Sequence, residues 1–341
     1  MSATGLRPSD RGTLPQLDGA GPEQERERHV RRTMLVLVLL TLAALAAYLT
    51  WDVRGSWSYA LDLRGRQAGA LVVVGAAVGA SSLVFQTIAG SRILTPGVMG
   101  FDSVYVLVQT VLVTAFGSGA LLMGVLPRFA LNTAVLTAFG LLLFSWLFRA
   151  RSRNLFVLVL VGIVMGTFFG SLTTLASRVL DPDDFLTLQQ LTFASFTTVD
   201  TRLLLVTAAA TVVGLVAMWP LLRAVDVIDL GRDNAVALGV DYHRVVRRVL
   251  VTVTVLVAAS AALVGPMLFL GLIVANLARQ VVRSHRHTVL VPASALVGVL
   301  CCVLGQLLVT HLFDLRTTLS VVINLVGGVY FLLLLMRTSR L

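Results

Sequence analysis

Long apolar runs, separated by short gaps that hold most of the charge, follow one another along almost the whole chain. The first run, residues 33–50, has 18 uncharged residues, close to the minimum for crossing a hydrocarbon core about 30 Å thick at about 1.5 Å per residue. The pattern predicts an all-α integral membrane protein. About ten transmembrane helices are expected, at Thr33–Thr50, Ala68–Ile88, Val98–Phe116, Phe129–Phe148, Leu155–Ser177, Leu203–Leu222, Val249–Val264, Met267–Ala278, Val289–Leu312 and Thr317–Met336.

The first apolar run also follows several arginines, which is typical of a cleaved signal peptide. It is long for a signal peptide, and the following Tyr-Leu-Thr-Trp lacks small residues for cleavage, so a retained helix is favoured. The segment before it is rich in Gly, Pro and charge and has no apolar periodicity. We therefore predict a disordered cytoplasmic tail over 1–32 and a membrane domain over 33–341.

Gly265 and Pro266 interrupt the apolar stretch that holds the seventh and eighth spans. Because proline lacks a backbone donor and breaks a helix, a tight outer turn between two helices fits this sequence. A single kinked helix is the alternative. It would put two groups of arginines on opposite sides of the membrane, so charge sidedness favours two helices; the groups are Arg244, Arg247 and Arg248, and Arg279 and Arg283.

All 27 basic residues are arginine, and their distribution predicts the topology. Ten spans place both termini on one side. With the termini in the cytoplasm, 20 arginines lie on inner segments and only seven on outer ones, which follows the positive-inside rule. The outer seven are Arg54, Arg64, Arg66, Arg128, Arg178, Arg202 and Arg316. This scatter between apolar runs explains the net charge of +10 better than nucleic acid binding does.

Composition then narrows the possible chemistry. With 57% hydrophobic residues, 13% charged residues and a mean hydropathy of +0.90, lipid is the expected solvent. The absence of lysine excludes a Walker A loop, so any ATP must be hydrolysed by a separate subunit. No HExxH or GxSxG motif occurs, and the two cysteines, Cys301 and Cys302, are adjacent in an apolar run. We expect no enzymatic activity and no catalytic, cofactor-binding or metal-binding residues.

Ionisable residues that could bind coupling ions are nearly absent from the spans, with Asp102 and His311 at predicted span ends. This argues against a secondary-active or efflux transporter that works alone, which remains the alternative function. In the fifth span, small and hydroxyl residues share one helix face: Gly162, Gly166, Gly170, Thr173 and Ser177. They are expected either to admit a neighbouring helix or to border a translocation pathway, and both can hold at a dimer axis.

Two loops are large enough to carry function. The inner loop, 223–248, holds several aspartates among apolar residues, and the outer loop, 178–202, contains a predicted short helix at the membrane, Phe185–Phe196. In the inner loop, residues 230–240 read Leu-Gly-Arg-Asp-Asn-Ala-Val-Ala-Leu-Gly-Val. Gly239 can stop the second helix of this segment with a positive φ.

Several segments in order carry a family resemblance. Residues 230–240 are one, and residues 265–279 another, with a Gly-Pro start, a central Phe-x-Gly-Leu and a final arginine, although Ala275-Asn276 stands where Pro-His is usual. Arg64, Gly75, Gln86 and the loop around Pro96 follow the same order. Between Leu63 and Met336 the chain resembles the iron-siderophore and cobalamin permeases of bacterial ABC importers, the FecCD family. Ala275-Asn276 and the segments 100–110 and 193–196 resemble its ferric catecholate or petrobactin-type subgroup.

The resemblance implies a type II ABC importer permease in the bacterial plasma membrane, surrounded by lipid, that imports a ferric siderophore. It implies a second permease subunit, identical or paralogous, two cytoplasmic ATPase subunits and an extracytoplasmic siderophore-binding protein. The expected ATPase-coupling residues are Gly231, Ala235, Leu238, Gly239 and Val240. On the outer side, the candidates for docking the binding protein are Arg64, Arg66 and Arg316, which could instead anchor span ends at lipid headgroups.

Overall fold

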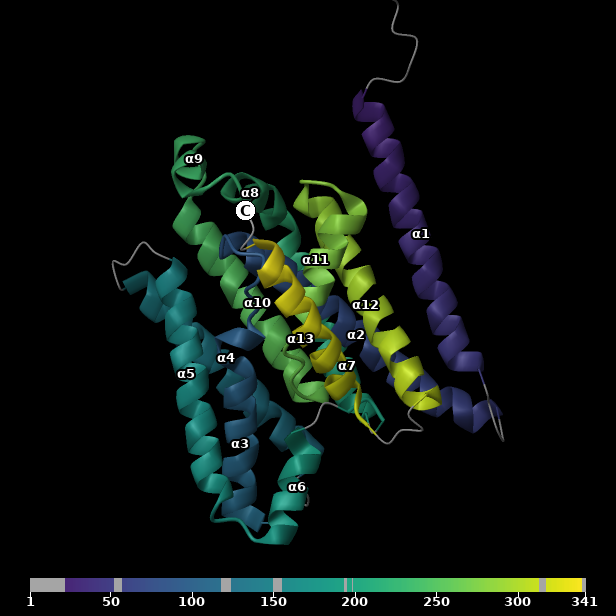
Figure 1. Cartoon of the computed structure of the whole chain (residues 1–341), viewed down its shortest axis with the longest axis vertical. Coiled ribbons are helices and arrows are strands. Elements are labelled where there is room, and N and C mark those ends of the chain that lie inside the picture. Colours follow the sequence, from purple (N-terminus) through teal and green to yellow (C-terminus); the bar gives the residue numbers. More distant parts are fainter. Residues whose placement is uncertain are drawn as a thin grey trace, which may run out of the picture.

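The computed structural model describes residues 22–51, 57–117, 124–149, 155–192, 195–197, 199–312 and 317–338. All regular structure in these ranges is helical, and the helices form one elongated bundle (Figure 1). In chain order the helices are α1 (Pro22–Thr50), α2 (Trp57–Ile88), η1 (Gly97–Met99), α3 (Phe101–Phe116), α4 (Val125–Arg149), α5 (Leu155–Ser177), α6 (Pro182–Thr192), α7 (Thr201–Met218), η3 (Trp219–Leu221), α8 (Leu222–Ile228), α9 (Arg232–Ala237), α10 (Tyr242–Val264), α11 (Leu270–Val282), α12 (His287–His311) and α13 (Leu319–Thr338).

The prediction of an all-α membrane protein is confirmed for the described residues. By length and composition, seven described helices can cross a membrane, and three shorter apolar helices, within α3, α11 and α13, accompany them. Each predicted apolar run coincides with one of these helices, while the count of ten crossings stays a prediction. α10 and α11 are separate, as the Gly265-Pro266 pair predicts, because Gly265 has a φ of 101° that ends α10.

Helix boundaries differ from the predicted spans at several places, and two of the differences concern segments expected outside the spans. α1 begins at Pro22, so residues 22–32 are helical rather than part of a disordered tail, and residues 1–21 lie outside the described part of the chain. This stretch is rich in Glu, Gln and Arg, which are good helix formers, and proline is well tolerated at the first helical position. The predicted short outer helix exists as α6, but it ends at Thr192.

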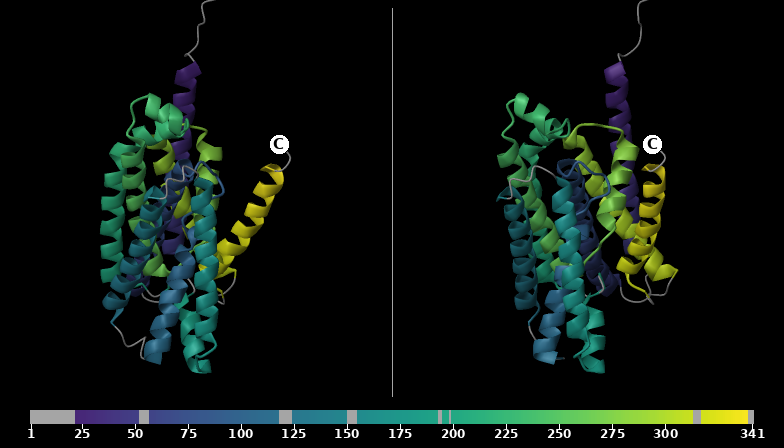
Figure 2. Two further views of the ribbon diagram at one scale, coloured as in Figure 1. Left: turned by 90° about the vertical axis from the view of Figure 1, so that its left-hand side faces the viewer. Right: turned by 60° about the vertical axis from the view of Figure 1, so that its left-hand side comes forward.

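α2 is the central helix of the bundle. Of the residues in its most apolar window, 72% are buried, against 17% for α1 and 6% for α5. α12, α10, α11 and α7 surround it. α1 lies at the edge of the bundle in Figure 1, and Figure 2 shows α13 diverging from the other helices toward its C-terminal end. The apolar face of α5 is therefore left for lipid or for another subunit.

The contact between α2 and α12 is a close approach of two backbones. A Cβ on Gly75 would lie 2.6 Å from the backbone nitrogen of Val299, and a Cβ on Gly298 would collide with the Gly75 carbonyl oxygen. One turn further along, the Ser294 hydroxyl donates to the Gly79 carbonyl oxygen at 2.7 Å. Glycine at these positions allows the two helices to share a dry, hydrogen-bonded seam.

Gly75→Ala is expected to lower the thermal unfolding midpoint of the purified protein in detergent, because the new methyl group has no room beside Val299. Overpacking of this kind costs about 1–3 kcal/mol. Gly170→Ala is the matched control, since nothing lies within 4 Å of a Cβ at Gly170. Equal midpoints for the two variants would contradict the close approach of α2 and α12.

Candidate functional site

α8 and α9 form a small helical hairpin at the end of the bundle where α1 begins, and α6 lies at the opposite end (Figure 1). Gly231, with a φ of 101°, separates α8 from α9. Gly239 ends α9 with a φ of 82°, as predicted. The Val240 N–H donates to the Ala235 carbonyl and the Gly239 N–H to the Val236 carbonyl, each at 3.0 Å, which is a Schellman cap.

The hairpin presents apolar side chains beyond the bundle. Leu230 is 62% exposed, Val236 57% and Leu238 65%. Exposed apolar groups gathered on one protruding element are typical of a protein contact surface. Ala235, in contrast, is fully buried, so its side chain packs inward and holds α9 in place. Of the predicted coupling residues, Leu238 therefore faces outward, and Leu230 and Val236 are additional exposed positions that the sequence did not single out.

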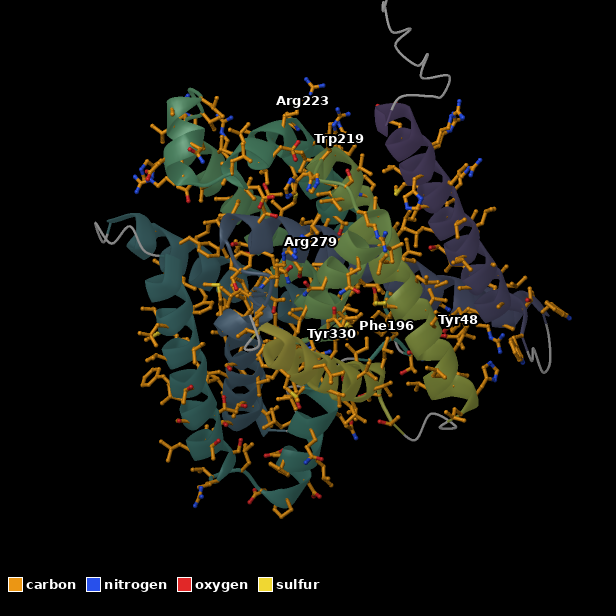
Figure 3. All side chains as sticks on the ribbon, turned by 45° about the horizontal axis from the view of Figure 1, so that its top comes forward. Tyr48, Phe196, Trp219, Arg223, Arg279 and Tyr330 are labelled. Atoms are coloured by element: carbon orange, nitrogen blue, oxygen red, sulfur yellow. The ribbon has the colours of Figure 1, made fainter. Side chains whose placement is uncertain are left out.

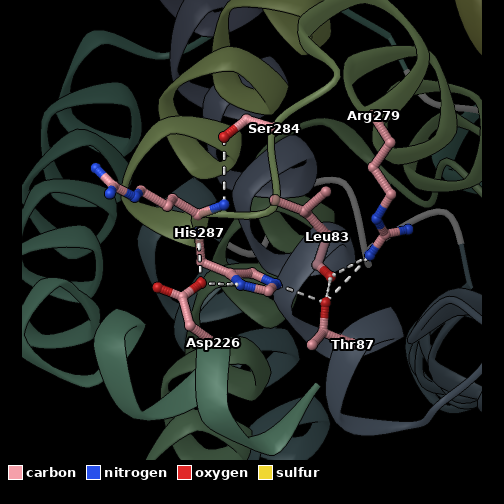
Figure 4. A network of polar contacts seen from close by, with 7 residues as sticks. Leu83, Thr87, Asp226, Arg279, Ser284 and His287 are labelled. Carbon is pink, nitrogen blue, oxygen red and sulfur yellow. Dashed lines mark hydrogen bonds and ion pairs between the residues drawn. The ribbon is translucent and has the colours of Figure 1, made fainter. Parts of the chain in front are cut away.

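A chain of polar contacts joins the hairpin to the helices beneath it (Figure 4). One oxygen of the Asp226 carboxylate, on α8, accepts from both the backbone N–H and the ring Nδ1–H of His287, each at 2.6 Å. His287 is the first residue of α12 and is 1% exposed. Its Nε2 lies 2.8 Å from the hydroxyl of Thr87 on α2. The start of α12, the end of α2 and α8 are thus linked through one buried imidazole.

Arg279 on α11 extends this chain. Its guanidinium donates to the Gln86 side-chain oxygen at 2.6 Å, to the Thr87 hydroxyl at 3.1 Å and to the Leu83 carbonyl at 3.2 Å. The Asn276 amide, one turn earlier, donates to the Arg92 carbonyl at 2.9 Å. Arg279 closes the signature segment noted in the sequence. Asp226, His287 and Thr87 were missed, because lone polar residues on three separate helices have no spacing that marks them.

The predicted pathway face of α5 is divided in the structure. A Cβ on Gly162 would lie 3.0 Å from the Met99 Cα, and one on Gly166 would lie 3.4 Å from the Gly100 Cα, so these glycines admit the η1 turn. Gly170 borders open space. The Thr173 and Ser177 hydroxyls donate to carbonyls of their own helix, at 2.9 and 2.8 Å. Helix approach therefore explains the first two glycines, and only the later positions remain open to a pathway.

Of the predicted docking arginines, Arg64 and Arg66 lie in the first part of α2, which meets α1 at the end opposite the hairpin (Figure 1). Arg64 donates to the Trp51 carbonyl at 2.6 Å and to the Tyr48 carbonyl at 3.3 Å, which caps the C-terminus of α1. Arg66 pairs with Asp62 one turn away, at 2.5 Å. Arg316 lies outside the described residues. These contacts hold the α1–α2 corner together and leave a docking role untested.

The sequence profile of the FecCD transport family matches residues 33–337, almost the whole helical part of the chain. The chain belongs to the FecCD transport family. This FecCD protein is 39% identical to the petrobactin import system permease protein YclO of Bacillus subtilis over 306 residues, which cover 89% of this chain and 97% of the relative. It is 31% identical to the petrobactin import system permease protein FatC of Bacillus anthracis over 312 residues, covering 91% and 88%.

A solved structure described as an inward-facing metal-chelate type ABC transporter has a TM-score of 0.79 to this FecCD chain. The two share 22% sequence identity, and the match covers 90% of this chain and 99% of the other. At this identity the likeness shows the fold, which is that of an ABC importer permease. Both the FecCD resemblance and the permease architecture expected from the sequence are confirmed.

Asp226→Ala is expected to destabilise the FecCD chain, because it leaves two N–H groups of buried His287 without an acceptor. Each buried donor left unpaired costs about 1–3 kcal/mol. Asp226→Asn keeps one carbonyl oxygen and should lose less. Thermal unfolding in detergent measures the difference, with Asp233→Ala, an exposed acid on α9, as the control. If the control loses as much stability as Asp226→Ala, the contact with His287 is not the cause.

Proposed function

We propose that this chain is the membrane-spanning permease subunit of an ATP-binding cassette importer that moves a ferric siderophore of the catecholate or petrobactin type into the cytoplasm. The observation that carries the proposal is the 39% identity to the petrobactin import permease YclO across 97% of that protein's length. The family match over residues 33–337 supports the same reading. The chain itself is not an enzyme, and the energy comes from separate ATPase subunits.

The α8–α9 hairpin is the proposed contact for those ATPase subunits. Its exposed Leu230, Val236 and Leu238 give a cytoplasmic partner an apolar surface, and glycines at both ends of α9 fix its shape. The chain of contacts from Asp226 through His287 to Thr87 would carry movement of α8 to α2 and α12. A hydrogen-bonded path of this kind suits a lever that transmits ATPase closure to the membrane helices.

The topology that this role needs puts the hairpin and both termini in the cytoplasm of a bacterial plasma membrane protein. Arginine sidedness supports it, with 20 of the 27 arginines on the segments that would then face inward. The opposite end, which carries Arg64 and Arg66, would then meet the extracytoplasmic siderophore-binding protein. Because Arg64 caps α1, steering by its charge would add to a structural role.

A second permease subunit, identical or paralogous, completes the proposed importer. α5 supports this, since only 6% of its apolar window is buried within the chain. Leu160, Val164, Phe168 and Leu175 are each at least half exposed along its length. The open stretch from Gly170 to Ser177 would then border a pathway shared by the two subunits.

The function is tested by reconstitution in proteoliposomes. The purified chain alone should hydrolyse no ATP, because it has no lysine for a Walker A loop. Together with a cognate ATPase, second permease and binding protein, it should import ferric catecholates, and a panel of iron chelates identifies the preferred one. Substrate uptake by the chain alone, driven by an ion gradient, would instead support the secondary-active alternative.

The ATPase contact is tested by disulfide crosslinking in the assembled importer. Leu238→Cys should crosslink to a cysteine scanned along the ATPase surface, because Leu238 is 65% exposed on the hairpin. Ala235→Cys is the control from the same turn of α9 and should crosslink poorly, since Ala235 is fully buried. Equal crosslinking at both positions, or none at Leu238, would remove this face of the hairpin from the contact.

A further inference from the structure

A pocket of about 600 Å³ opens beside the polar chain, between the end of α2, the end of α11 and the start of α12. Its volume lies in the range of small-molecule sites, about 300–1,000 Å³. Such sites are mostly apolar, whereas among the described residues that line this one Leu290 is the only hydrophobic side chain. A pocket of this size and polarity suits a charged ligand rather than a hydrophobic one.

The charge of the pocket is strongly positive. Arg92, Arg279 and Arg283 line it, and Asp229 is the only acid among its described lining residues, so two positive charges are uncompensated. Neither the Arg92 nor the Arg283 guanidinium has a hydrogen-bond or ion-pair partner in the described part of the chain. These groups come from the loop after α2 and from the end of α11, and they converge on one cavity. Guanidinium groups that converge on one cavity are suited to bind an oxyanion.

A buried donor points to the same ligand. The Gln86 side chain is 1% exposed, and its amide nitrogen has no hydrogen-bond partner, although its oxygen accepts from Arg279. An unpaired buried amide is costly and is normally satisfied by a ligand or water. Because Gln86 lines the pocket, an acceptor bound there can pair with this nitrogen. Ser91 and Ser284 add hydroxyl donors at the same rim.

We propose that this pocket binds a phosphate-bearing anion. A phosphate monoester carries about −1.5 to −2 charge at pH 7, which matches the two uncompensated positive charges, and has three acceptor oxygens for the arginine and amide donors. Two sources can supply a phosphate group: a soluble phosphate compound, and an anionic phospholipid, whose phosphodiester carries about one negative charge. Figure 3 brings this end of the bundle forward and shows Arg279 within it, with Arg223 farther out on α8.

The site is built into the path to the hairpin. Thr87 and His287 line the pocket, and His287 holds Asp226 of α8. Arg279 bonds Thr87 and lines the pocket as well (Figure 4). An anion that accepts hydrogen bonds from Arg279 competes with Thr87 for the same donors. It would thereby change the contacts through which Thr87 and His287 hold α8. Anion binding in the pocket does not depend on the proposed function. Control of ATP hydrolysis by the bound anion does rest on the proposed function.

Binding is tested with the purified chain in nanodiscs, using inorganic pyrophosphate in magnesium-free buffer and, separately, phosphatidylglycerol added to phosphatidylcholine discs. The readouts are thermal unfolding and, for lipid, native mass spectrometry. The double variant Arg92→Gln/Arg283→Gln should lower the affinity about tenfold or more, because two charge-assisted contacts are lost. The control, Arg247→Gln/Arg248→Gln, removes two exposed arginines that do not line the pocket, and should keep the affinity.

Each result decides a specific point. Pyrophosphate binding in pure phosphatidylcholine supports a soluble phosphate ligand, and retention of phosphatidylglycerol without pyrophosphate binding supports a lipid headgroup. No binding of either probe, or an equal loss in both double variants, overturns the site. If the ATP hydrolysis rate of the reconstituted importer does not change when the anion binds, only the proposed control of the hairpin is refuted. That outcome leaves both the anion site and the import function in place.

Discussion

Lipid tails are as apolar as leucine, so helices in a membrane associate through close packing and hydrogen bonds rather than through the hydrophobic effect. In this protein that requirement is met where α2 crosses α12, with Gly75 against Gly298 and Ser294 bonded to Gly79. α1, α7, α10, α11 and α13 pack against one or both of these helices, and α3, α4 and α5 join the bundle through α10 and one another. Because α2 and α12 pack together, the end of α2 lies beside the start of α12, where Thr87 contacts His287.

The polar groups of the chain gather where that pair reaches one end of the bundle. A buried imidazole and a guanidinium would be costly in the hydrocarbon, but there they bond to Asp226, Thr87 and the Gln86 side-chain oxygen and tie α8 to α2, α11 and α12. The result is a short hairpin that projects apolar side chains yet is bonded to the most buried helix of the bundle. This combination supports the proposed action of an external partner on the membrane helices.

In contrast, α5 packs on α3 and on the η1 turn at Gly162 and Gly166, but few of its residues are fully buried. Such an uncovered helix supports the proposed second permease subunit. Within the FecCD family this fits a pathway that forms between permeases rather than inside one. Arg64 at the α1–α2 corner shows that a charged residue near the end of a membrane helix can serve as a helix cap.

The sequence alone determined the helical class, the position of each apolar run, the break at Gly265-Pro266 and the stop at Gly239, because hydrophobicity and backbone preference act locally. It also indicated the FecCD family, because several characteristic segments occur in a fixed order. It could not reveal that Ala235 faces inward, since a six-residue helix has no periodicity to read. Only the tertiary structure brought Asp226, Thr87 and His287 together, because they lie on helices far apart in the chain, and hydrogen bonds between them depend on packing that no local pattern encodes.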